Sequence, residues 1–126
     1  MKHGEFIKHV AERAGVRKDI AEKLTQATLE TLADRLSGGE PHDLASQLPQ
    51  ELQDYVRPST KLNEKFGPDE FVRRVAAKAG VDDETAAKGA RAVGITIKEA
   101  ITPGEWDDVM AQLPKEYAGF LETAPA

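Results

Sequence analysis

The stretch EFIKHVAERAGV, residues 5–16, returns with conservative changes as EFVRRVAAKAGV at residues 70–81. Apolar residues recur every three or four positions in both stretches, which predicts a helix with one buried face. Both stretches end in Gly-Val, and the glycine stands where a left-handed residue closes a helix. We therefore expect Gly15 and Gly80 to end two equivalent helices.

The repeat continues well beyond these helices. Residues 5–56 align without a gap with residues 70–121, and 18 of the 52 aligned positions are identical. The later identities are Gly39/Gly104, Glu40/Glu105, Asp43/Asp108, Gln47/Gln112, Leu48/Leu113, Pro49/Pro114 and Glu51/Glu116. A gap-free match of this density indicates an internal duplication. We expect a first repeat over residues 1–56, a linker over residues 57–67 and a second repeat over residues 68–126.

Each repeat predicts four helices. The longest, residues 18–36 and 83–101, are apolar on two sides, so we place them at the centre. Ser37 and Thr102, each followed three residues later by glutamate, predict capping boxes, and Leu-Pro pairs then separate the third helix from the fourth. The sequence therefore predicts an all-α protein, in which two fused four-helix repeats form one compact helical bundle with a pseudo-twofold axis. A half of about 60 residues buries too little surface to stand alone, so we expect one shared core.

Composition narrows the possible functions. The 126 residues include no cysteine, which excludes disulfides, cysteine-based zinc sites and thiol catalysis. The formal charge of -5 argues against nucleic-acid binding, and no stretch approaches the roughly 20 apolar residues of a membrane span. The N-terminal residues lack the apolar core of a signal peptide. We expect a cytoplasmic protein without nucleic-acid or membrane partners.

A family resemblance accompanies the repeat. Residues 5–16, ATLETLADRL at residues 27–36, Gly39-Glu40 and QLPQEL at residues 47–52 together resemble the bacterial family named domain of unknown function 2267. The likeness covers both repeats and implies an all-helical cytoplasmic bacterial protein made of two tandem copies. It implies no activity and no catalytic residue.

The second repeat departs from the pattern at Gly89 and Gly94, where the first repeat has Leu24 and Leu29. Two glycines inside one helix cost about 1 kcal/mol each relative to alanine, so something should compensate. Our hypothesis is that the two long helices cross here, with Leu24 in the space left by Gly89. The alternatives are a looser helix or a small apolar pocket lined by Gly89, Val93, Gly94 and Ile97.

Other candidate residues have simpler interpretations. Trp106, the one tryptophan, is expected to pack over a helix end or to be an exposed anchor for a partner. Glu105, Asp107 and Asp108 could hold a divalent ion, but acidic residues in a first helical turn already complement the helix dipole. The recurring Glu40 and Glu105 fit helix capping. We therefore expect no metal site, no cofactor and no catalytic residue.

The sequence thus favours a small non-enzymatic protein-interaction or adaptor module, with an unknown protein partner or a homodimer. The alternative is a small-molecule-binding protein or an enzyme that uses an apolar cavity beside Gly89 and Gly94. The candidate ligand- or partner-binding residues are Gly89, Val93, Gly94 and Trp106.

Overall fold

The structure is a computed structural model that describes residues 1–57 and 65–122. Most of the expected linker, residues 58–64, and the last four residues of the second repeat lie outside the described part. The described chain forms eight helices and no strand, which confirms the all-α prediction. The helices are α1 (His3–Ala14), α2 (Lys18–Ala33), α3 (Glu40–Gln47), α4 (Gln50–Gln53), α5 (Pro68–Ala79), α6 (Asp83–Ala100), α7 (Pro103–Ala111) and α8 (Glu116–Leu121). No helix in the described ranges combines the length and apolar character needed to cross a membrane.

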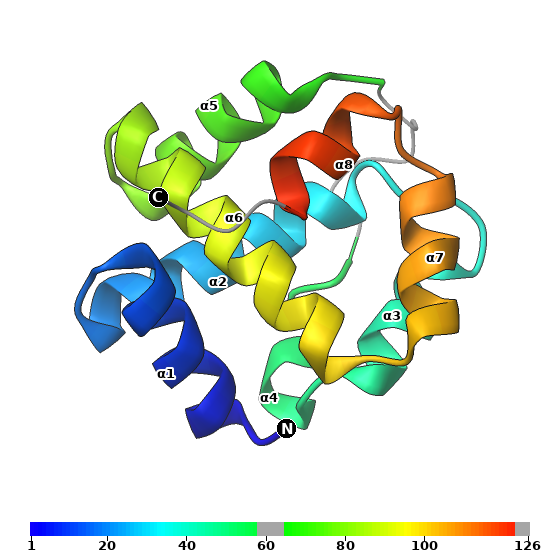
Figure 1. Ribbon diagram of the computed structural model, residues 1–126, viewed down its shortest axis with the longest axis horizontal. Coiled ribbons are helices and arrows are strands. Elements are labelled where there is room, and N and C mark those ends of the chain that lie inside the picture. Colours follow the sequence, from blue (N-terminus) through cyan, green and yellow to red (C-terminus); the bar gives the residue numbers. More distant parts are fainter. Residues whose placement is uncertain (58–64, 123–126) are drawn as a thin grey trace.

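The long helices α2 and α6 cross in the middle of the molecule, as their two apolar sides predict (Figure 1). Each of them contacts the other, and each also contacts both α1 and α5. The first helix of each half therefore packs on the long helices of both halves. As a result, buried apolar residues from the two halves form one continuous cluster, which includes Phe6, Leu24, Leu29, Phe71 and Val93. The pseudo-twofold axis itself remains a prediction.

Several helix ends follow the sequence signals. Gly15 and Gly80 are left-handed, with φ of 69° and 70°, and their N–H groups donate to the carbonyls of Ala11 and Ala76. The Asp82 carboxylate accepts from the Thr85 N–H at 2.8 Å and so caps α6. Helix α6 continues without a break through residues 94–97.

The first repeat lacks its predicted capping box. In the second repeat only half of the predicted box forms. The Glu105 N–H donates to Thr102 Oγ1 at 3.2 Å and Pro103 opens α7, but the Thr102 N–H donates to Gln47 and not to Glu105. The equivalent of Pro103 is Gly38, which takes a left-handed φ of 62° and delays α3 to Glu40. Proline presets the helical φ, whereas this left-handed glycine cannot occupy a first helical turn. Helix α2 also ends at Ala33, three residues before its predicted end.

Two glutamines replace the missing cap and join the halves. Gln112, at the end of α7, accepts from the Ser37 N–H at 2.8 Å before α3. Gln47, at the end of α3, accepts from the Thr102 N–H at 2.8 Å before α7. Each half thus satisfies a backbone donor of the other half, and α3 and α7 lie against each other on one side of the molecule (Figure 1).

Candidate metal centre

Gly89 and Gly94, where the second repeat departs from the first, lie in the core. A Cβ on Gly89 would lie 2.6 Å from Leu24 Cδ2 and 2.9 Å from Leu24 Cγ, so the long helices cross with Leu24 seated on Gly89. A Cβ on Gly94 would lie 2.8 Å from the Leu121 carbonyl oxygen and 3.2 Å from Leu121 Cβ. The crossing hypothesis is therefore confirmed. The alternative of an apolar pocket at these glycines is wrong, because Leu24 and Leu121 occupy the space.

Val93 and Trp106 are likewise covered. Val93 is fully buried, and Trp106 is 3% exposed with its Nε1–H donating to Glu122 Oε1 at 2.7 Å. Trp106 thus packs over a helix end, and the alternative of an exposed aromatic anchor is wrong. The four predicted site residues do not form a common surface in the described chain.

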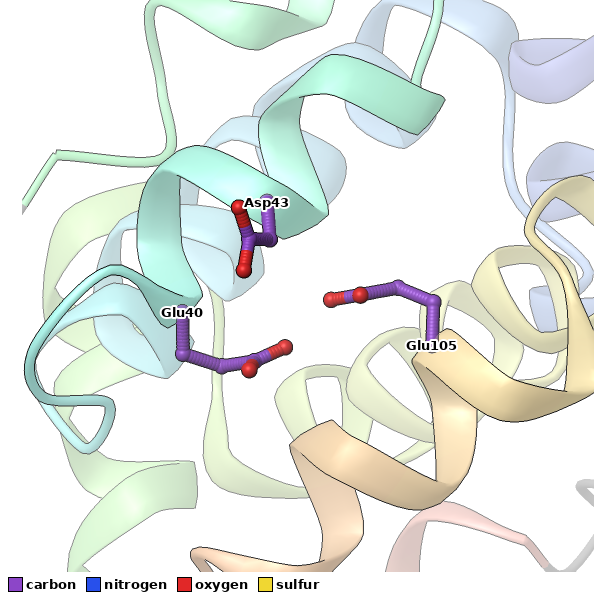
Figure 2. A group of neighbouring side chains, drawn as sticks. All are labelled: Glu40, Asp43 and Glu105. Atoms are coloured by element: carbon purple, nitrogen blue, oxygen red, sulfur yellow. The ribbon is translucent and has the colours of Figure 1, made fainter.

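A different group of residues converges between α3 and α7. Glu40, Asp43 and Glu105, here called the carboxylate cluster, turn their side chains toward one another (Figure 2). Glu40 is the first residue of α3, Asp43 lies one turn later, and Glu105 lies in the first turn of α7. One oxygen from each residue lies within 4.8 Å of the others.

The duplication explains why acidic side chains meet here. Helices α3 and α7 both carry the sequence Gly-Glu-x-x-Asp, at residues 39–43 and 104–108. In a helix, positions three residues apart share a face, so each motif presents two carboxylates to one side. The reciprocal glutamine contacts hold these helices together, which brings the two motifs into proximity.

The cluster leaves buried carboxyl oxygens without hydrogen-bond partners in the described chain. Glu105 is 7% exposed, and its Oε2 has no hydrogen-bond partner in the described chain. Glu40 is partly buried, and its Oε1 also has no partner there. An unpaired buried carboxylate costs several kcal/mol, which a bound proton or cation would relieve.

The electrostatics of Glu40 show how unfavourable the negative charge is. Burial is the first cause that raises its pKa to about 8, followed by the hydrogen bond with Glu105 and the charges of Glu105, Asp108 and Asp43. Without a cation, Glu40 therefore keeps its proton near neutral pH. A cation placed between Glu40 and Glu105 would favour the ionised form instead.

The ligand set is typical of a hard divalent ion. Carboxylate oxygens suit Ca²⁺, Mg²⁺ and Mn²⁺, whereas the softer metals favour histidine or cysteine. Ligands on opposite sides of one Ca²⁺ lie about 5 Å apart, since each Ca–O distance is about 2.3–2.6 Å. The 4.8 Å limit within the cluster satisfies this condition without movement of the helices. Mg²⁺, with shorter bonds of about 2.0–2.1 Å, requires oxygens no more than about 4.2 Å apart.

Sequence reasoning missed this group because it considered each helix alone. It combined Glu105 with Asp107 and Asp108, whereas the structure combines Glu105 with Glu40 and Asp43 from the other half. The assignment of Glu40 to a capping box is wrong, since α3 has no side-chain cap. The available signal was the joint recurrence of glutamate and aspartate at the same spacing in both repeats.

Comparison with known proteins adds a family but no activity. The model of a family described as "Uncharacterized conserved protein (DUF2267)" matches residues 3–120, nearly the whole chain and both halves, in one span. No curated protein matches the chain.

Proposed function

The chain belongs to the DUF2267 family of uncharacterised conserved proteins, and we propose that it is a non-enzymatic protein that binds one divalent cation in the carboxylate cluster. The observation that carries this proposal is the Glu105 carboxylate, which is buried, directed at Glu40 and Asp43, and left without a partner for Oε2. Three carboxylates bring more negative charge than one proton can offset. A divalent ion neutralises two of these charges and satisfies the unpaired oxygens at once.

The bound ion would act as a structural tie. Two of its ligands come from α3 in the first half and one from α7 in the second half, so binding would hold the two helices together. The contact between α3 and α7 already includes two hydrogen bonds between the halves, in which Gln112 and Gln47 accept from backbone N–H groups. Water would supply the remaining ligands, because Ca²⁺ takes six to eight oxygens.

We also propose that the protein acts as a protein-interaction or adaptor module. Cation binding is compatible with this role. An ion that fixes α3 against α7 would stabilise one defined surface there without performing chemistry. Coelution with a protein partner in the presence of Ca²⁺, and its loss in chelator, would support an adaptor that uses this surface.

Thermal unfolding with Ca²⁺, Mg²⁺ or Mn²⁺ tests the cation site directly. At a Ca²⁺ concentration 100 times the dissociation constant, a single site adds about 2.7 kcal/mol to the free energy of unfolding. We expect Ca²⁺ to raise the Tm by several degrees at neutral pH and chelator to reverse the change. Isothermal titration calorimetry should give a stoichiometry of one ion per chain.

Matched variants separate this site from general ion effects. Glu105→Gln should abolish the Ca²⁺-dependent rise in Tm, since it removes a charged ligand without a large change in volume. Glu51→Gln should leave the rise intact, because Glu51 is an exposed glutamate of α4 that recurs in both repeats but lies outside the cluster. An equal rise in both variants, or no saturable heat with any of the three ions, would reject the proposal.

A further inference from the structure

A groove opens where the N-terminal parts of α5 and α6 meet α8. Its volume of about 540 Å³ lies within the about 300–1,000 Å³ typical of small-molecule sites. It is lined by Pro68, Asp69, Val72, Arg73, Asp83, Glu84, Ala87, Arg91, Gly119 and Phe120. No member of the carboxylate cluster lines it, so ligand binding in this groove is independent of cation binding.

Substitutions between the two repeats account for the opening. In the first half, His3 Nε2 lies 2.9 Å from Glu22 Oε1, and this pair bridges the corresponding space between α1 and α2. The equivalent residues of the second half are Pro68 and Ala87, which cannot make such a bridge. Both line the groove, so the loss of this pair leaves space between α5 and α6.

Arg91 brings a cation without its local acceptor to this space. Its side chain is half-buried, its Nε is shielded from solvent without a hydrogen-bond partner in the described chain, and its guanidinium carbon lies 5.7 Å from the Phe120 ring centre. The first-half equivalent, Gln26, donates to Glu30 at 3.3 Å. The equivalent of Glu30 is Ile95, so the second half provides no acceptor four residues along the helix.

The remaining lining residues define what the guanidinium can bind. Val72, Ala87 and Phe120 give an apolar wall, while Asp69, Asp83 and Glu84 bring negative charge, although Glu84 also lies 3.7 Å from Lys88 Nζ. Arg73, the other cation of the lining, is paired with Glu70 at 2.9 Å. These acidic residues oppose a doubly charged anion such as phosphate, and they favour a ligand that also carries an ammonium group. A carboxylate matches the planar fork of arginine through two parallel hydrogen bonds.

We propose that this groove binds a small zwitterion with an apolar side chain, of the amino-acid class. The ligand carboxylate pairs with Arg91, its side chain packs against Val72 and Phe120, and its ammonium group faces the acidic residues. Both charges and the apolar body are needed for binding, which distinguishes this site from a general anion site.

Titration of the full chain with L-leucine, followed by two-dimensional amide NMR, tests the proposal. We expect saturable shifts at Val72, Ala87, Arg91 and Gly119. L-leucinamide, which lacks the carboxylate, and N-acetyl-L-leucine, which lacks the ammonium group, should each bind at least about tenfold more weakly, because each loses a charge-assisted contact.

Two variants provide independent checks. Arg91→Gln introduces the residue found at the equivalent position of the first half and should weaken leucine binding by about tenfold or more. Ala87→Glu restores the first-half residue, narrows the groove and should also abolish the shifts. Arg57→Gln, at an exposed arginine paired with Asp54 elsewhere, should change nothing.

Other outcomes would reject the zwitterion site. These are the absence of saturable groove shifts at millimolar leucine, equal binding of the amide and the free amino acid, or full binding by Arg91→Gln. If the Ca²⁺-dependent rise in Tm persists in Arg91→Gln, cation binding in the carboxylate cluster does not depend on the groove. Failure of the zwitterion site would then leave the proposed cation site unaffected.

Discussion

Glu40 and Glu105 are glutamates at equivalent positions of the two repeats, yet their surroundings differ. The Glu105 N–H is held by the Thr102 hydroxyl at the start of α7, whereas α3 has no side-chain cap and Glu40 begins it directly. Both carboxylates then meet in the same space, and the charge of Glu105 opposes ionisation of Glu40. Each glutamate therefore lies at the start of its own helix, and the two side chains also interact electrostatically across the two halves.

The raised pKa of Glu40 predicts how stability depends on pH without a cation. Because its pKa rises from 4.5 to about 8 on folding, the folded protein binds this proton more tightly than the unfolded chain does. The free energy of unfolding should therefore fall as the pH rises through this window, by an amount on the order of a few kcal/mol. Urea unfolding in chelator from about pH 5 to about pH 9 measures this slope.

The neutral variant is the control for this prediction. Glu40→Gln keeps the size of the protonated side chain and removes its titration, so the slope attributed to Glu40 should disappear. Stability of this variant near pH 9 should exceed that of the natural chain. A slope that is unchanged in Glu40→Gln would assign the pH dependence to other groups.

At the scale of helices, the crossing of α2 and α6 depends on one leucine and one glycine. Leu24 is fully buried, and a Cβ on Gly89 would lie less than 3 Å from three of its carbon atoms. Real side-chain contacts do not reach such distances, and a buried Leu24 has little room to move. The cost of a glycine inside α6 is thus offset by close approach of the two longest helices.

The effect of Gly89→Ala on the free energy of unfolding should change sign when the residue at position 24 is changed. In the natural chain, Gly89→Ala should destabilise by about 1 kcal/mol, since overpacking of about 1–3 kcal/mol exceeds the gain in helix propensity of about 1 kcal/mol. In a Leu24→Ala background, itself destabilised by about 2–5 kcal/mol, the same change should stabilise by about 1 kcal/mol. Urea unfolding of the four proteins gives the coupling energy.

Gly119→Ala is the matched control, because a Cβ at this position of α8 meets no atom of the described chain within 4 Å. It should stabilise the protein regardless of residue 24. A Gly89→Ala change that is stabilising in both backgrounds would contradict close crossing at this point.

At the scale of the whole molecule, local patterns were sufficient for most of the fold. Apolar periodicity, the glycines after α1 and α5, and Asp82 gave the helices and several of their ends. The contacts that build the carboxylate cluster were not predictable in this way, because Glu40 and Glu105 are 65 positions apart and belong to different halves. Gln47 and Gln112 show the same limit: their recurrence was visible, but their backbone partners lie across the molecule.

The shared core predicts that the two halves unfold together. Since α1 and α5 each pack on the long helices of both halves, neither half can lose its structure without exposing apolar surface of the other.

Trp106 reports on the second half, where it is buried and hydrogen-bonded to Glu122. Its fluorescence and the far-ultraviolet circular dichroism of all helices should therefore give one coincident transition in urea. Leu52→Ala, at a fully buried residue of α4 in the first half, should shift both midpoints equally. A tryptophan transition that keeps its midpoint while the circular dichroism shifts would mean that the halves are energetically separate despite their common core.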